Sequence, residues 1–85
     1  MRIISQDGHY DIPYEQTVLS RGSKAIYADA VNVENIIIAS YSSEEKAIKA
    51  MKMCREEYLD FETYGSNMFP FESPKVFQFP ADDKI

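Results

Sequence analysis

The sequence predicts an α+β domain in which a small antiparallel sheet packs against one long amphipathic helix. Two observations support this prediction. The apolar run Ile-Ile-Ile-Ala at 36–39 is typical of a strand, and residues 43–62, which follow it closely, carry apolar side chains at helical spacing. The chain of 85 residues is long enough for one hydrophobic core, so we expect a single domain over 1–85.

Four strands are expected before the helix. The first, at 2–5, ends in a turn at 6–8 (Gln-Asp-Gly), where glycine tolerates a positive φ. Pro13 cannot donate a hydrogen bond to a strand ladder, so residues 11–15 form a sheet edge, a bulge or a turn. The other three strands are expected at 16–20, 24–31 and 36–41.

The strand at 36–41 has apolar residues on both of its faces. Alternation places Ile36 and Ile38 on one face, and Ile37 and Ala39 on the other. A strand of this kind is normally covered on both sides, whereas one helix covers only one. We expect the second face to be covered by the aromatic segment 69–79 or by a second copy of the chain, and we favour a homo-oligomer.

The helix has the clearest local signals in the sequence. Ser42 is the expected N-cap, and Glu45, three residues later, completes a capping box. Gly65 stops the helix or lies just past its end. A loop is expected at 63–75 and a last strand at 76–79. The apolar stripe that faces the sheet consists of Ala47, Met51, Cys54, Tyr58 and Phe61, and it is widened by Ile48, Ala50 and Leu59.

Charge and composition exclude several classes of function. The net charge is −5 and no basic stripe is present, so we expect no nucleic-acid partner. One cysteine and one histidine cannot form the usual zinc cluster, and one cysteine cannot form an internal disulfide. No apolar run approaches the length of a membrane span or a signal peptide. We therefore expect a cytoplasmic protein with no membrane partner, no metal and no cofactor.

The residues that a search for catalytic groups selects each have a structural explanation. Cys54 lies within the apolar stripe, as expected of a buried thiol. His9 with Asp11 can form an oriented general base, but the same pair fits a turn. The carboxylates of Asp7, Asp11 and Glu15 do not follow the spacing of a calcium loop. No nucleophile elbow or phosphate-binding loop is present, so we predict that the protein is not an enzyme.

Aromatic side chains in loops are the main candidates for binding. Tyrosine and phenylalanine beside proline can anchor a protein interface or stack on a base, and they can equally fold back over an open sheet face. The candidate binding residues are Tyr10, Tyr14, Arg21, Tyr64, Phe69 and Phe71.

Three segments of the chain carry a resemblance to other proteins. They read Met-Arg-Ile-Ile-Ser-Gln-Asp-Gly at 1–8, Asp-Ile-Pro-Tyr-Glu at 11–15 and Phe-Gln-Phe-Pro-Ala-Asp-Asp at 77–83. Together they resemble short uncharacterised proteins of Gram-positive bacteria and of the phages integrated in their genomes. The resemblance brings no catalytic or ligand-binding residue. It implies a mobile-element setting, in which small acidic proteins without enzymatic motifs often inhibit host systems.

Two functions are expected from these observations. The first is a non-enzymatic interaction protein, phage or mobile-element encoded, that binds a host protein and blocks it. The alternative is a protein that sequesters a small nucleotide-like signal in a pocket between subunits. In that case Arg2, Arg21 or Arg55 would contact phosphate, and an aromatic ring would stack on the base.

Overall fold

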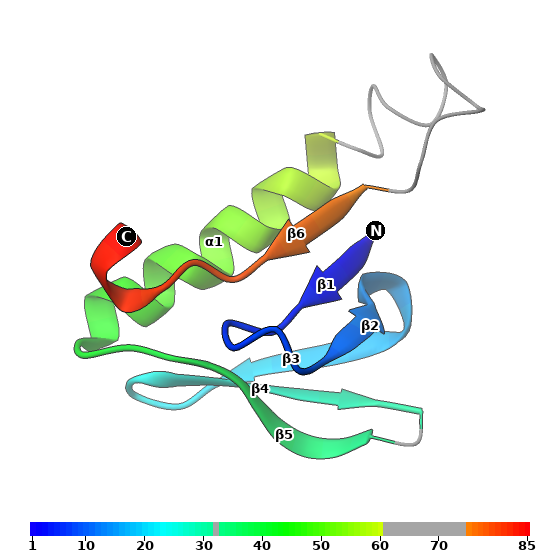
Figure 1. The fold of residues 1–85 in the computed structure, drawn as a ribbon, viewed down its shortest axis with the longest axis horizontal. Coiled ribbons are helices and arrows are strands. Elements are labelled where there is room, and N and C mark those ends of the chain that lie inside the picture. Colours follow the sequence, from blue (N-terminus) through cyan, green and yellow to red (C-terminus); the bar gives the residue numbers. More distant parts are fainter. Residues whose placement is uncertain (32, 61–74) are drawn as a thin grey trace.

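The structure is a computed structural model that describes residues 1–31, 33–60 and 75–85. Within these ranges the chain forms six strands, one α-helix and two short 3₁₀-helices, and the predicted α+β class is confirmed (Figure 1). The elements in chain order are β1 (Arg2–Ile4), β2 (Asp11–Pro13), η1 (Tyr14–Gln16), β3 (Thr17–Arg21), β4 (Ala25–Ala30), β5 (Val33–Ser40), α1 (Glu44–Asp60), β6 (Val76–Gln78) and η3 (Asp82–Lys84).

The sheet that packs against α1 is an antiparallel meander in the order β3-β4-β5. A tight turn joins its first two strands, and the main-chain N–H of Gly22 donates to the carbonyl of Ala25 at 2.9 Å. Ile26 and Ala28 of the central strand are fully buried because their side chains point toward the helix. This hairpin joins strands close to those predicted at 16–20 and 24–31.

A second, three-stranded sheet has the order β2-β1-β6. β1 and β2 are antiparallel, whereas β1 and β6 are parallel, and in this register Ile3 lies opposite both Ile12 and Phe77. Pro13 ends the edge strand β2, as its missing donor requires. The sequence predicted a strand at 76–79 but not its parallel pairing with the N-terminal strand, which lies about seventy positions away.

Both sheets and α1 contribute to one hydrophobic core. Phe77 and Phe79 pack edge to face inside it, with ring centroids 5.2 Å apart. The predicted apolar stripe of the helix is confirmed for Ala47, Ala50 and Cys54, which are fully buried. It is wrong for Ile48 and Leu59, which stay exposed at the margins of the buried face. The predicted helix residues 61 and 62, the stop at Gly65 and residues 63–74 of the predicted loop lie outside the described residues.

The predicted alternation along β5 holds for Ile36, Ile37 and Ile38 but is wrong for Ala39, because a bulge interrupts the strand. Ile26 pairs with Ala39 and Tyr27 pairs with Ile37, so Ile38 is an extra residue in the ladder. The bulge lets Ile38 and Ala39 both enter the core, while Ile37 on the outer face stays 56% exposed.

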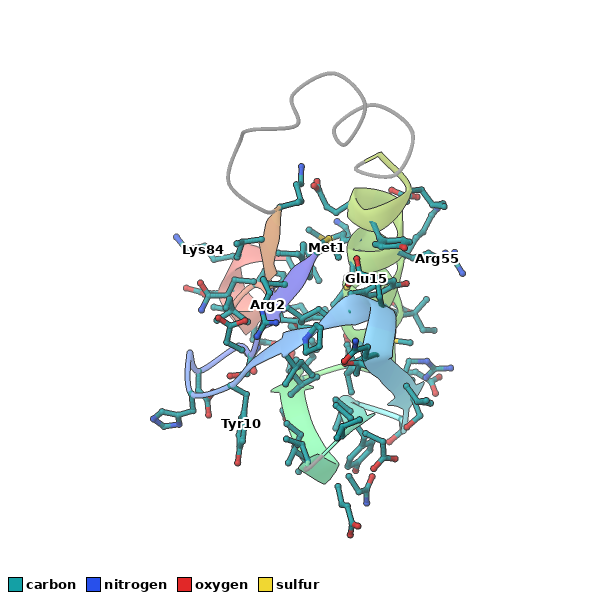
Figure 2. All side chains as sticks on the ribbon, turned by 90° about the vertical axis from the view of Figure 1, so that its right-hand side faces the viewer. Met1, Arg2, Tyr10, Glu15, Arg55 and Lys84 are labelled. Carbon is teal, nitrogen blue, oxygen red and sulfur yellow. The ribbon has the colours of Figure 1, made fainter. Side chains whose placement is uncertain are left out.

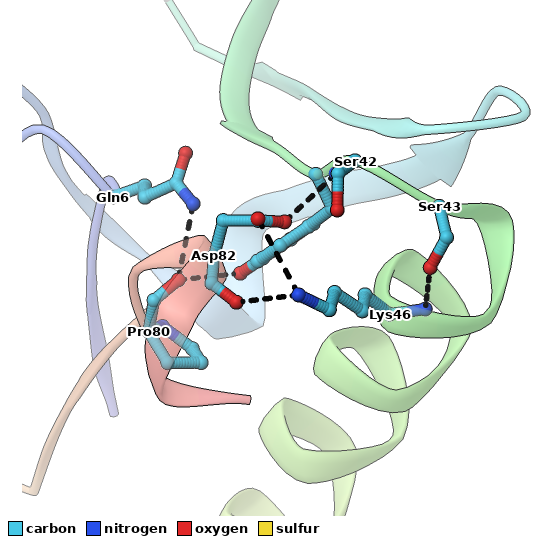
Figure 3. A network of polar contacts seen from close by, with 7 residues as sticks. Gln6, Ser42, Ser43, Lys46, Pro80 and Asp82 are labelled. Atoms are coloured by element: carbon cyan, nitrogen blue, oxygen red, sulfur yellow. Dashed lines mark hydrogen bonds and ion pairs between the residues drawn. The ribbon is translucent and has the colours of Figure 1, made fainter.

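The predicted helix start is wrong by one residue. α1 begins at Glu44, and the main-chain N–H of Lys46 donates to Oγ of Ser43 at 3.3 Å, which makes Ser43 the N-cap. The third helical position is then Lys46 and not Glu45, so no capping box forms. Ser42 has another partner, since its main-chain N–H donates to Oδ1 of Asp82 at 2.8 Å (Figure 3).

The C-terminal segment is anchored beside the start of α1 (Figure 3). The carbonyl of Pro80 accepts hydrogen bonds from Nε2 of Gln6 at 3.1 Å and from the hydroxyl of Tyr41 at 2.9 Å. Burial raises the pKa of Tyr41 to about 12, so this phenol stays a donor at neutral pH. Nζ of Lys46 donates to the carbonyl of Asp82 at 2.9 Å. These contacts join the first turn, the helix start and the C-terminal segment.

Candidate binding groove

A groove between the edge strand β3 and the helix α1 brings together aromatic, cationic and apolar side chains. We call it the β3–α1 groove. Its volume is about 450 Å³, within the range of small-molecule sites. The residues that line it are Tyr14, Thr17, Leu19, Arg21, Ile48, Met51, Lys52 and Arg55.

Strand and helix periodicity explain why these side chains converge. Residues 17, 19 and 21 are every second residue of β3, so they share one face of the sheet. Residues 48, 51, 52 and 55 follow the spacing of one helix face, which here borders that strand. Tyr14, in the 3₁₀-turn before β3, closes one end of the groove.

Tyr14 is held as a wall of the groove. Its ring packs on that of Tyr58, with centroids 4.4 Å apart and an angle of 32° between the ring planes. Burial raises the pKa of the Tyr14 phenol, so the group is neutral at physiological pH. The groove therefore offers the neutral hydroxyl of Tyr14 beside its charged residues.

Three cationic side chains line the groove although the whole chain has a net charge of −5. Nη1 of Arg21 lies 3.2 Å from Oε2 of Glu44, and Nζ of Lys52 lies 3.9 Å from Oε1 of Glu56. Arg55 forms no ion pair with another residue in the described ranges. Exposed ion pairs contribute only about 0–1 kcal/mol, so an incoming carboxylate or phosphate can compete for these cations.

Leu19, Ile48 and Met51 give the same groove an apolar surface. Met51 and Leu19 pack against the hydrophobic core, whereas Ile48 is exposed. A ligand that carries both a negative charge and an apolar side chain would find partners for both within this one groove.

The structure brings together two of the six predicted binding residues, Tyr14 and Arg21. Tyr10 is exposed in the turn that follows Gly8, and Figure 2 shows Tyr10 and Arg55 on opposite sides of the molecule. The predicted residues Tyr64, Phe69 and Phe71 lie outside the described residues.

Of the three arginines proposed for phosphate, Arg21 and Arg55 line the groove and Arg2 does not. Nε of Arg2 donates to Oδ1 of Asp11 at 2.8 Å, and Nη2 donates to the carbonyl of the same residue. Sequence reasoning did not select Lys52 as a binding residue. The helical spacing of Lys52 and Arg55 was visible, but the neighbouring strand that makes them part of a groove was not.

Of the two interpretations of His9 and Asp11, the structure supports the turn, because His9 contacts Asp7 while Asp11 pairs with Arg2. Nδ1 of His9 lies 3.1 Å from Oδ2 of Asp7, in a turn where the imidazole side chain is 80% exposed. The hydroxyl of Ser5 and the main-chain N–H of His9 hold the pKa of Asp7 below its usual value. These contacts are those of a solvent-exposed turn.

The single cysteine occupies a structural position. Cys54 is fully buried in the core, as predicted, and burial raises its pKa to about 12. Its thiol is therefore protonated and shielded at neutral pH. In the described part of the chain, no three His, Cys, Asp or Glu side chains come together as a metal-binding group.

No protein-family model matches this chain, and neither a curated protein nor a solved structure matches it. No helix in the described ranges has both the length and the apolar character needed to cross a membrane. The chemistry of the β3–α1 groove is therefore the basis for the functional proposal.

Proposed function

We propose that this chain is a non-enzymatic interaction protein that binds an acidic segment of another protein in the β3–α1 groove and thereby blocks that protein. The observation that supports the proposal is the grouping of Arg21, Lys52 and Arg55 around an apolar surface in an otherwise acidic chain. Charge complementarity of this kind speeds encounter and disfavours basic partners. The resemblance to proteins of Gram-positive bacteria and their phages favours a host protein as the target.

The groove is suited to binding of moderate strength. A hydrogen bond from a cationic side chain to a carboxylate contributes about 1.5–3 kcal/mol, and one buried apolar side chain contributes about the same. Association itself consumes a large part of this gain, because the partners lose freedom of motion. We therefore expect a dissociation constant in the micromolar range, which corresponds to about 8 kcal/mol.

A comparative capture experiment tests this proposal. Immobilised wild type, Arg55→Glu and Lys49→Glu are incubated with a Gram-positive host lysate at low and high salt. Lys49 is an exposed residue of the same helix outside the groove, so the two variants change the charge equally. We expect an acidic protein that is retained by wild type and Lys49→Glu, lost with Arg55→Glu, and released by salt. Identical retention by both variants would exclude the groove as the binding surface.

The second candidate function is sequestration of a nucleotide-like molecule. It is favoured by the presence of Tyr14 beside Arg21 and Arg55, a pairing of aromatic and cationic groups that suits a base and a phosphate. This groove lies within one chain and not between subunits, where the sequence analysis expected the pocket. We rank the function second because Tyr58 already covers one face of the Tyr14 ring.

Thermal-shift measurements separate the two functions. A nucleotide at a hundredfold its dissociation constant adds about 2.7 kcal/mol of stability to a protein that binds it only when folded. A shift with one nucleotide that is absent in Arg55→Glu and retained in Lys49→Glu would favour the second function. No shift across a panel of mono-, di- and cyclic nucleotides would exclude it.

A further inference from the structure

β3 is an edge strand, and its free side borders the β3–α1 groove. β4 is its one strand neighbour within the described part of the chain. The hydrogen bond from Gly22 N–H to the carbonyl of Ala25 closes the hairpin, and it determines which pairs exchange hydrogen bonds farther along the ladder. Along an antiparallel ladder, hydrogen-bonded and non-hydrogen-bonded pairs alternate. Because Gly22 and Ala25 form a hydrogen-bonded pair, Arg21 and Ile26 form a non-hydrogen-bonded pair, and so do Leu19 and Ala28. The main-chain N–H and C=O groups of Leu19 and Arg21 therefore point away from β4, across the free edge.

The opposite edge of the same sheet is protected. The main-chain N–H of Gln6 donates to the carbonyl of Ile38 at 2.8 Å, and Oε1 of Gln6 accepts from the main-chain N–H of Ser40 at 3.0 Å. Proteins usually shield strand edges because unpaired main-chain groups attract other strands. In this sheet Gln6 covers part of the β5 edge, at Ile38 and Ser40, whereas the β3 edge adjoins the cationic groove.

We propose that the β3–α1 groove receives an extended acidic peptide segment that pairs with β3 as an added strand. This inference rests on the proposed function and specifies how the partner is bound. Leu19 and Arg21 would supply main-chain hydrogen bonds, which do not depend on the partner's sequence. Alternate side chains of the added strand would face α1, where acidic residues meet Lys52 and Arg55 and an apolar residue meets Met51.

The choice of an acidic occupant follows from charge. The groove carries three cationic side chains, and the carboxylates paired with them, those of Glu44 and Glu56, are more than half exposed. A basic segment would place like charges beside Arg21, Lys52 and Arg55. A neutral segment would leave Arg21 and Lys52 with only their weak surface partners, and it would bring no carboxylate to Arg55.

The test uses a labelled synthetic peptide with Glu, Leu and Glu at every second position, separated by threonines. Two further versions carry N-methyl groups on one or the other alternate set of main-chain nitrogens. A strand uses only one set for pairing, because successive N–H groups point to opposite sides. Fluorescence anisotropy should show about a tenfold loss of affinity for one version and little change for the other. A fourth peptide, with Lys in place of each Glu, should bind much more weakly than the parent peptide.

Protein variants distinguish failure of this inference from failure of the proposed function. If both methylated peptides bind like the unmodified one, while Arg55→Glu still weakens binding and Lys49→Glu does not, the groove binds acidic segments without strand addition. The present inference is then wrong and the proposed function stands. If the Arg55→Glu and Lys49→Glu variants bind the peptide equally well, or if wild type binds no peptide, both the strand-addition inference and the proposed binding of acidic segments are wrong.

Amide hydrogen exchange gives an independent measurement. The main-chain N–H groups of Leu19 and Arg21 should exchange quickly in the free protein, since they face the open edge. The peptide should slow the exchange of these two amides, while the amides of Val18 and Ser20, which pair with β4, should be protected in both states. Unchanged exchange at Leu19 and Arg21 in the saturated complex would contradict strand addition.

Discussion

The main-chain N–H of Ser42 donates to Oδ1 of Asp82 at 2.8 Å, which joins two residues that are 40 positions apart. This contact ties the residue before the helix cap to the C-terminal segment. The next residue, Ser43, is the N-cap of α1, since its Oγ accepts from the main-chain N–H of Lys46.

The first prediction concerns the pH dependence of this contact. The main-chain N–H of Ser42, together with Lys46, holds the pKa of Asp82 below its usual value. A carboxyl whose pKa is lower in the folded state stabilises the protein above its unfolded pKa and loses that contribution as the pH falls through its folded pKa. Urea unfolding at pH 7 and pH 3 should therefore show a smaller loss of stability for Asp82→Ala than for wild type.

Asp83→Ala is the matched control, because Asp83 is an exposed carboxyl in the same 3₁₀-turn. Its acid sensitivity should follow that of wild type. If Asp82→Ala and wild type lose equal stability between the two pH values, the Ser42–Asp82 contact does not contribute in solution.

The second prediction concerns the helix cap. Ser43→Ala removes the hydroxyl that accepts from the N–H of Lys46, so chemical denaturation should show a loss of about 1 kcal/mol. Ser42→Ala should cost less, since the main-chain donor to Asp82 remains. A larger loss for Ser42→Ala than for Ser43→Ala would mean that Ser42 is the N-cap, as the sequence pattern predicted.

The third prediction concerns the thiol. Cys54 is fully buried and its pKa is about 12, so a thiol reagent at pH 8 should modify native protein far more slowly than protein in denaturant. A cysteine introduced at the exposed position Lys49 should react quickly in the same native sample. Comparable rates for Cys54 in native and denatured protein would show that this face of α1 is open to solvent.

The fourth prediction concerns self-association. Val18 and Ile37 remain 68% and 56% exposed on the outer face of the β3-β4-β5 sheet. The sequence favoured a homo-oligomer, and this face is where we expect the contact. Light scattering at high micromolar concentration should show wild type as an oligomer and Ile37→Glu as a smaller species. Val76→Glu, an exposed position on the other sheet, is the control.

A variant truncated at Gly65 is not a suitable test of self-association, because the truncation also removes β6 and the buried Phe79. Loss of this core phenylalanine alone would cost about 3–5 kcal/mol. A monomeric wild type would contradict the predicted homo-oligomer, and an Ile37→Glu variant that keeps the oligomeric state of wild type would place the contact elsewhere.

Local patterns were sufficient for most of the elements. Period-2 and period-3.6 spacing predicted strands close to β3, β4 and β5, and predicted the helix α1 with Cys54 on its buried face. These features depend on neighbours within a few positions. The parallel pairing of β1 with β6 and the bulge at Ile38 depend on partners that are distant in sequence, so no local pattern predicted them.

The candidate site shows the same division. Arg21, Lys52 and Arg55 can be read from the sequence, and the spacing of Lys52 and Arg55 predicts that they share one helix face. That β3 lies beside this face with an unpaired edge, and that Arg2 and Tyr10 lie elsewhere, is known only from the folded chain. Helix and strand periodicity are properties of adjacent residues, whereas a groove exists only where packing brings two separate elements together.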